Sequence, residues 1–132
     1  MAVNPVSDEL TLGPILFHWP AEQKRDFYFR IADEAPVDSV YLGEVICSKR
    51  EPFFKPYIDE VVERLQQAGK HVVFSTLAEI MLVRERRLTD ELCAQADTIV
   101  EANDSAALNF LRGKAHRIGP FRNVYNEKTL EL

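Results

Sequence analysis

The feature that most constrains the fold is a regular alternation of short apolar runs with longer amphipathic segments. The apolar runs end at glycine or polar residues, which predicts five strands, over residues 10–18, 39–42, 71–75, 97–101 and 117–119. The segments that follow them have helical periodicity or helix-capping residues, over residues 21–32, 51–69, 77–96, 103–113 and 126–132. Strands that alternate with helices are typical of a parallel sheet with right-handed crossovers. The sequence therefore predicts an α/β fold.

The most consistent architecture is a TIM-type (β/α) barrel that is incomplete in this chain. No Gly-x-Gly-x-x-Gly or Walker-type loop is present, which disfavours a nucleotide-binding Rossmann domain. A (β/α) barrel needs about eight strands and about 250 residues, whereas the 132 residues here provide about five strands. We therefore interpret residues 10–132 as the N-terminal part of such a barrel, preceded by a flexible leader over residues 1–9.

Charge and composition exclude several classes of partner. Sixteen Lys and Arg residues against 21 Asp and Glu residues give a net charge of −5, which disfavours nucleic acid or an anionic membrane as the main partner. No apolar run approaches the roughly 18 residues of a membrane span, and the first residues do not resemble a signal peptide. The two cysteines, Cys47 and Cys93, do not suggest a disulfide framework. A reducing cytoplasmic location is expected.

Polar residues gather where the predicted strands end, and ligands of parallel α/β proteins bind at that edge. They are His18, Glu44, Cys47, Ser75, Thr76, Glu101, Asn103, Asn123 and Asn126. Helix capping explains Ser75, Thr76, Asn103 and Asn126 about equally well. Glu44 stands between two residues that are expected to be buried, so it is the candidate catalytic residue, able to accept a hydrogen bond or orient a substrate.

Cys47 has two interpretations from the residues alone. It is either a packing or unused loop cysteine, or a ligand of a metal or an iron–sulfur cluster, which usually takes about four thiolates. Lys49 and Arg50 would favour the thiolate form that a ligand requires. Cys93 lies within a predicted helix and is expected in the core. The three histidines, His18, His71 and His116, have no ligand spacing.

The stretch Val40-Tyr41-Leu42-Gly43-Glu44, followed by Cys47-Ser48-Lys49-Arg50, resembles the second-strand motif of the collagenase-like peptidase family (peptidase family U-thirty-two). The Tyr-Leu-Gly part is typical of the family, and the attached Cys-Ser-Lys-Arg is typical of its ubiquinone-biosynthesis branch. Other stretches agree in order from Leu12 to the end of the chain: Leu12-Gly13-Pro14, Trp19-Pro20, Ser75-Thr76-Leu77, Glu101-Ala102-Asn103-Asp104, Gly119-Pro120 and Asn123-Val124-Tyr125-Asn126.

This resemblance implies a subunit of an oxygen-independent hydroxylation system in ubiquinone biosynthesis. Members of the branch carry a four-iron, four-sulfur cluster (4Fe-4S) and form a heterodimer with a UbiU-like paralogue. Other ubiquinone-biosynthesis proteins are further partners. Cys47 matches the first cluster ligand, and Cys93 matches none of the family's cysteines. The other three ligands belong to the second half of the family's barrel. This chain alone is therefore expected to be inactive and to retain no cluster, while Ser75, Glu101, Asn123 and Asn126 would lie on the substrate-facing rim.

Other functions remain open at this point. A collagenase-like peptidase would match the family name, but no Ser-His-Asp, Cys-His or His-Glu-x-x-His arrangement is evident. A non-catalytic interaction module of a heterodimer is a third function, from another class. An RNA-hydroxylating relative fits less well, because the acidic balance does not suit RNA.

Overall fold

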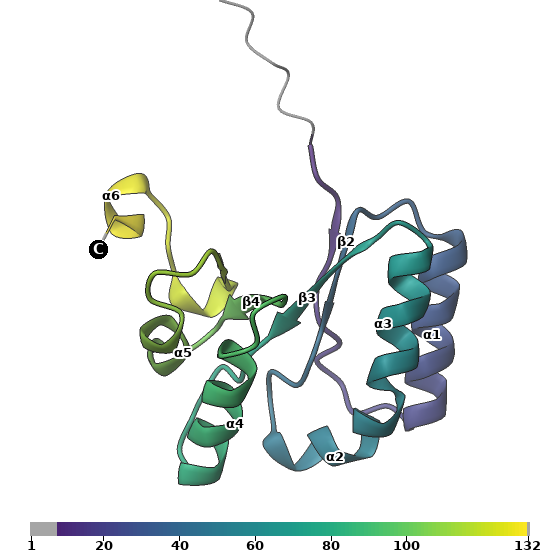
Figure 1. Cartoon of the computed structure of the whole chain (residues 1–132), viewed down its shortest axis with the longest axis horizontal. Helices are drawn as coiled ribbons and strands as arrows, with labels where there is room; N and C mark the ends of the chain where they lie inside the picture. Colours follow the sequence, from purple (N-terminus) through teal and green to yellow (C-terminus); the bar gives the residue numbers. More distant parts are fainter. Residues whose placement is uncertain (1–7, 132) are drawn as a thin grey trace, which may run out of the picture.

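Five parallel strands in chain order form a curled half-barrel (Figure 1). The computed structural model describes residues 8–131. The strands are β1 (Thr11–Leu12), β2 (Ser39–Leu42), β3 (His71–Ser75), β4 (Ile99–Ala102) and β5 (Arg117–Ile118). The helices are α1 (Ala21–Glu34), α2 (Glu51–Phe54), α3 (Ile58–Gln67), α4 (Val83–Cys93), α5 (Ser105–Phe110) and α6 (Glu127–Leu130). The predicted partial (β/α) barrel is thus confirmed.

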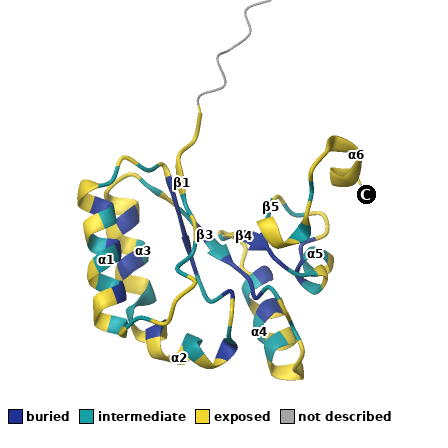
Figure 2. Cartoon of the chain, turned by 180° about the vertical axis from the view of Figure 1, so that it is seen from behind, coloured by how far each residue is buried: buried dark blue, intermediate teal, exposed yellow. Residues whose placement is uncertain are grey.

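The four longer crossover helices cover the outer face of the sheet in two groups, which Figure 2 shows with their buried sides toward the strands. Around β2, Val40 and Leu42 pack with α1 and α3. Around β4, Val100 and Ala102 pack with α4 and α5, in a cluster that includes Cys93. Because successive side chains of a strand point to opposite faces, the alternate residues of these strands lie on the inner, concave face.

The concave face is rich in polar side chains close to the sheet. Ser39 and Tyr41 of β2, Ser75 of β3, Glu101 of β4 and Arg117 of β5 belong to it by alternation and register. A face that packs only against apolar helices would instead favour aliphatic residues. The outer face is therefore apolar, while the inner face carries these polar side chains beside Val73 and Ile99, and the inner face is where the site lies.

The first strand is much shorter than predicted. Residues 10–18 were expected to be extended throughout, but only Thr11–Leu12 pairs with β2. Pro14 has no N–H to donate, so it cannot continue the ladder. The chain from Gly13 to Pro20 instead runs as an irregular segment to the start of α1. This correction places Phe17, His18 and Trp19 in a loop at the carboxyl end of the sheet.

Two predicted helices also have different bounds. The segment over residues 51–69 divides into α2, a short 3-10 turn (Lys55–Tyr57) and α3, because Pro56 interrupts the helical hydrogen bonding. The helix expected over residues 77–96 begins only at Val83. Residues before it are held by neighbouring loops: the Ala78 N–H donates to Val45 O at 2.9 Å. The Glu85 carboxylate accepts from the N–H groups of Met81 and Leu82, which fixes the helix start.

The remaining elements agree closely with the predictions. β2 and β3 have the predicted bounds, β4 and β5 are displaced by two residues or fewer, and α5 and α6 begin where their caps predict. Asp104 accepts from Ala106 N–H, and Asn126 accepts from Thr129 N–H. Most of the predicted leader, residues 1–7, lies outside the described residues. Within residues 8–131, no helix is both long enough and apolar enough to cross a membrane.

Candidate functional site

A buried polar cluster joins the carboxyl ends of β3 and β4. Ser75 Oγ donates to Glu101 Oε1 at 3.0 Å, and Asn103 Nδ2 donates to the same oxygen at 2.9 Å. Asn103 Nδ2 also donates to Thr76 O at 3.0 Å, while Thr76 Oγ1 donates to Glu101 O at 3.1 Å. All four residues are buried. The cluster therefore fixes the position of one carboxylate at the edge where parallel α/β proteins bind ligands.

Glu101 is a buried carboxylate without a cationic partner among residues 8–131. It is 7% exposed, and both of its side-chain hydrogen bonds end on Oε1. Its register neighbour on β5 is Arg117, but the guanidinium of Arg117 binds elsewhere. Two neutral donors thus hold the carboxylate, and its second oxygen has no hydrogen bond from the described residues. Chemically, Glu101 is suited to accept a proton or a hydrogen bond from a ligand.

Two glycines allow the strands to pack closely around this cluster. Gly43 has a φ of 109°, and a Cβ placed on it would lie 2.6 Å from Ser75 O. A Cβ on Gly119 would lie 1.7 Å from Asn103 Oδ1. That oxygen is buried and has no hydrogen-bond partner within residues 8–131. Both neighbouring strands, β2 and β5, therefore depend on glycine for their fit against β3 and β4.

Glu44, the candidate catalytic residue, shapes the loop after β2. Its Oε1 accepts hydrogen bonds from the N–H groups of Ile46 at 3.1 Å and Cys47 at 3.0 Å. The same oxygen lies 4.0 Å from a nitrogen of Arg50, whose guanidinium also donates to Leu16 O. One oxygen of Glu44 is therefore committed to the backbone of its own loop. Its catalytic role stays a prediction, whereas these hydrogen bonds give it a role in stabilising the loop.

The loop that carries Cys47 is held at both ends. Glu44 binds the Cys47 N–H on one side, and on the other Ser48 Oγ donates to Glu85 Oε1 at 2.6 Å. Cys47 is half-buried and forms no disulfide within residues 8–131. Cys93 is in the core with Val100 and Leu111, and burial raises the pKa of its thiol. The prediction that Cys93 is a core residue is confirmed.

The described residues do not fit a four-iron, four-sulfur cluster by themselves. Such a cluster takes about four thiolates, and the sequence has two cysteines, one of which is in the core. Within residues 8–131 no group of three or more His, Cys, Asp or Glu side chains could hold a metal ion. Cys47 is thus the single thiolate that these residues could contribute to a cluster.

The predicted rim residues divide into two groups. Ser75 and Glu101 form a direct hydrogen bond, as described above. Asn123 has a left-handed backbone with a φ of 53° and accepts from Tyr125 Oη, while Asn126 caps α6. The last two side chains therefore make local contacts beyond β5, and within residues 8–131 no hydrogen bond joins them to the Glu101 cluster.

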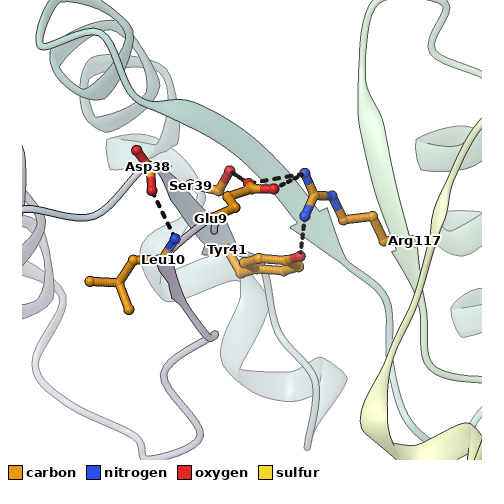
Figure 3. A network of polar contacts seen from close by, with 6 residues as sticks. All are labelled: Glu9, Leu10, Asp38, Ser39, Tyr41 and Arg117. Atoms are coloured by element: carbon orange, nitrogen blue, oxygen red, sulfur yellow. Dashed lines mark hydrogen bonds and ion pairs between the residues drawn. The ribbon is translucent and has the colours of Figure 1, made fainter. Parts of the chain in front are cut away.

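A second polar network crosses the concave face (Figure 3). Arg117 of β5 donates to Tyr41 Oη on β2 at 3.2 Å and to Glu9 Oε1, which precedes β1, at 3.1 Å. Ser39 Oγ also donates to Glu9. Hydrogen bonds from Ser39 and Arg117 hold the pKa of the Glu9 carboxyl below its ordinary value. The network links the two outer strands of the sheet, β1 and β5, across its concave face.

Sequence reasoning missed this network and the importance of Asn103. The available signal was the alternation in Ser39-Val40-Tyr41-Leu42, which puts a hydroxyl on every second position of a strand that otherwise reads as apolar. The pairing of Arg117 with Glu9 spans 108 residues, so no local pattern indicates it. No protein-family model and no solved structure matches the chain.

Proposed function

We propose that this chain is a UbiV-like subunit of an oxygen-independent hydroxylation system in ubiquinone biosynthesis, acting with a UbiU-like partner. The observation that carries the proposal is the position of Cys47. It follows the carboxyl end of β2, in a loop fixed by Glu44 and by Ser48, and its thiol is not sealed in the core. This is where a (β/α) barrel places ligand-binding residues.

In this proposal Cys47 provides one thiolate, and the other ligands of a four-iron, four-sulfur cluster come from residues outside this sequence. The fold contributes the rest of the rim: Glu101 is held by Ser75 and Asn103 at the same edge of the sheet. The half-barrel alone would bind no complete cluster. Activity would therefore require the partner or further chain.

Iron content tests the proposal. A form of the protein that also carries the other cluster ligands is purified without oxygen and without the partner, and iron and acid-labile sulfide are measured per chain. Cys47→Ala is expected to lower bound iron by about four atoms per chain, since the ligand set of a cubane would be incomplete. Cys93→Ala is the matched control, and it is expected to leave iron unchanged because Cys93 is buried among apolar residues. Iron that persists in Cys47→Ala, or is absent from the wild-type form that carries all the ligands, would contradict the proposal.

A non-catalytic partner module is a second candidate, favoured by the two outer strands. Among the strands that the structure describes, β1 and β5 each pair on one side only, and each has two residues. Unpaired strand edges are templates for pairing with another chain. A peptidase has less support, since no hydrogen bond within residues 8–131 joins the Cys47 thiol to a histidine.

The open edges predict that the purified chain associates. Light scattering is expected to give a dimer or larger species at about micromolar concentration, because pairing of β1 or β5 with a second chain would satisfy their free backbone groups. Adding the partner would then convert this species into a heterodimer if the module interpretation is right. A monodisperse monomer that stays monomeric on concentration would contradict this expectation.

A further inference from the structure

A small cavity opens beside the Glu44 loop, at the carboxyl ends of β1 and β2. It lies between the segment that follows β1, the first turn of α1, and residues 50–54. Its volume is about 10 Å³, which is close to the space that one water molecule requires. Its wall includes Phe17, Trp19, Lys24, Glu44, Arg50 and Phe53.

Lys24 lies in this wall with its ammonium group unpaired. The residue is 8% exposed, and its Nζ makes neither a hydrogen bond nor an ion pair within residues 8–131. Nζ lies over the face of the Phe54 ring, 4.5 Å from its centroid, in a cation–π contact. Burial lowers the pKa of Lys24. The charge of the nearby Glu44 carboxylate favours the ammonium form, but no hydrogen bond or ion pair within residues 8–131 joins the two groups, so a further anion would stabilise this buried cation.

The charges around the cavity leave an excess of one positive charge. Lys24 and Arg50 are cationic, and among the described residues of the wall Glu44 is the one carboxylate. One oxygen of Glu44 already accepts two backbone N–H groups of its loop. Arg50 lies 4.0 Å from that oxygen and donates to Leu16 O. A single anionic group entering the cavity would balance the local charge.

The mouth of the cavity is aromatic and open to solvent. Phe17 is 75% exposed and Phe53 is 64% exposed. The ring of His18 contacts that of Phe53 edge-on, with centroids 5.6 Å apart. Exposed aromatic side chains beside two cations, Lys24 and Arg50, are suited to hold the apolar part of an anionic organic molecule.

We propose that Lys24 and Arg50 bind the oxyanion of a small organic ligand, a carboxylate or a phosphate, whose apolar part lies on Phe17 and Phe53. The volume of the cavity admits one oxygen, so the body of the ligand remains at the mouth. The site uses different residues from the Glu101 cluster and from Cys47. It therefore stands whether or not the chain is an iron–sulfur subunit.

Trp19 allows a direct test, because it lines the cavity and is the single tryptophan of the sequence. Its fluorescence is followed while inorganic phosphate, phenyl phosphate, acetate or benzoate is added at constant ionic strength, which keeps general screening fixed. We expect saturable binding, tighter for the aromatic member of each pair. Comparison of phosphates with carboxylates identifies the preferred oxyanion. The absence of a saturable signal with all four probes would overturn the proposal.

Two variants separate this site from a general charge effect. Lys24→Met removes the ammonium while keeping an unbranched chain, and it is expected to weaken binding by about tenfold or more. Lys49→Met removes the same charge from an exposed position outside the wall and is expected to leave the dissociation constant unchanged. Wild-type affinity in Lys24→Met would overturn the proposal. If Lys24→Met does not fold, Arg50→Gln decides the question by the same readout.

Discussion

Replacement of Gly43 by alanine is expected to lower the free energy of unfolding by about 3 kcal/mol or more, and the melting temperature by about 10 °C. The φ of 109° is one that residues with a Cβ rarely adopt. In addition, the new methyl group would lie 2.6 Å from Ser75 O, a backbone atom of the neighbouring strand that cannot move alone. Thermal and urea unfolding followed by circular dichroism measure both quantities.

Two other glycines separate the contributions to this effect. Gly69 has a φ of 78° with nothing within 4 Å of the added Cβ, so Gly69→Ala is expected to report backbone strain alone, about 1 kcal/mol. Gly13 has an ordinary φ and equally open space, so Gly13→Ala is expected to change stability by less than about 0.5 kcal/mol. If Gly43→Ala costs no more than Gly69→Ala, the close approach of β2 to β3 at this point is wrong.

Local sequence patterns predict most of the strands and helices, and the wrong bounds of β1 and α4 have identifiable causes. β2 and β3 are predicted to the residue because an apolar run ends at a glycine or a polar residue in each. β1 is overestimated because the run from Leu10 to His18 looks apolar, whereas Pro14 removes the donor that pairing needs. The start of α4 depends on Glu85 and on contacts with another loop, which no periodicity within the helix encodes.

The candidate site was less predictable because its contacts join distant parts of the chain. Ser75 and Glu101 could be expected to meet, since both end parallel strands that are neighbours. Asn103 looked equally suited to cap a helix, but Asp104 caps α5 and leaves Asn103 free to bind Glu101. Lys24 reads in the sequence as part of the solvated side of a helix. The lysine is buried because the loop before α1 and the segment around Phe54, both outside its own helix, pack around it.

The second large effect is expected at Gly119, where Gly119→Ala should lower the free energy of unfolding by about 2–4 kcal/mol. Here the backbone is not the cause, since a φ of −77° suits any residue. The methyl group would occupy the place of Asn103 Oδ1, 1.7 Å away, and would force that side chain out. Asn103 would then release Thr76 O and Glu101 Oε1. The buried carboxylate would keep one donor, Ser75.

A double-mutant cycle tests this mechanism against a general packing defect. Asn103→Ala alone is expected to cost about 2–3 kcal/mol, because two buried acceptors lose their donor. In that background Gly119→Ala should cost little, since the methyl group then enters the space that the amide has left. The expected coupling energy is about 2 kcal/mol, measured by urea unfolding of the four proteins. If the two losses of unfolding free energy are additive, Gly119 and Asn103 contribute to stability independently. The methyl group at residue 119 would then not act by displacing the Asn103 amide from Glu101.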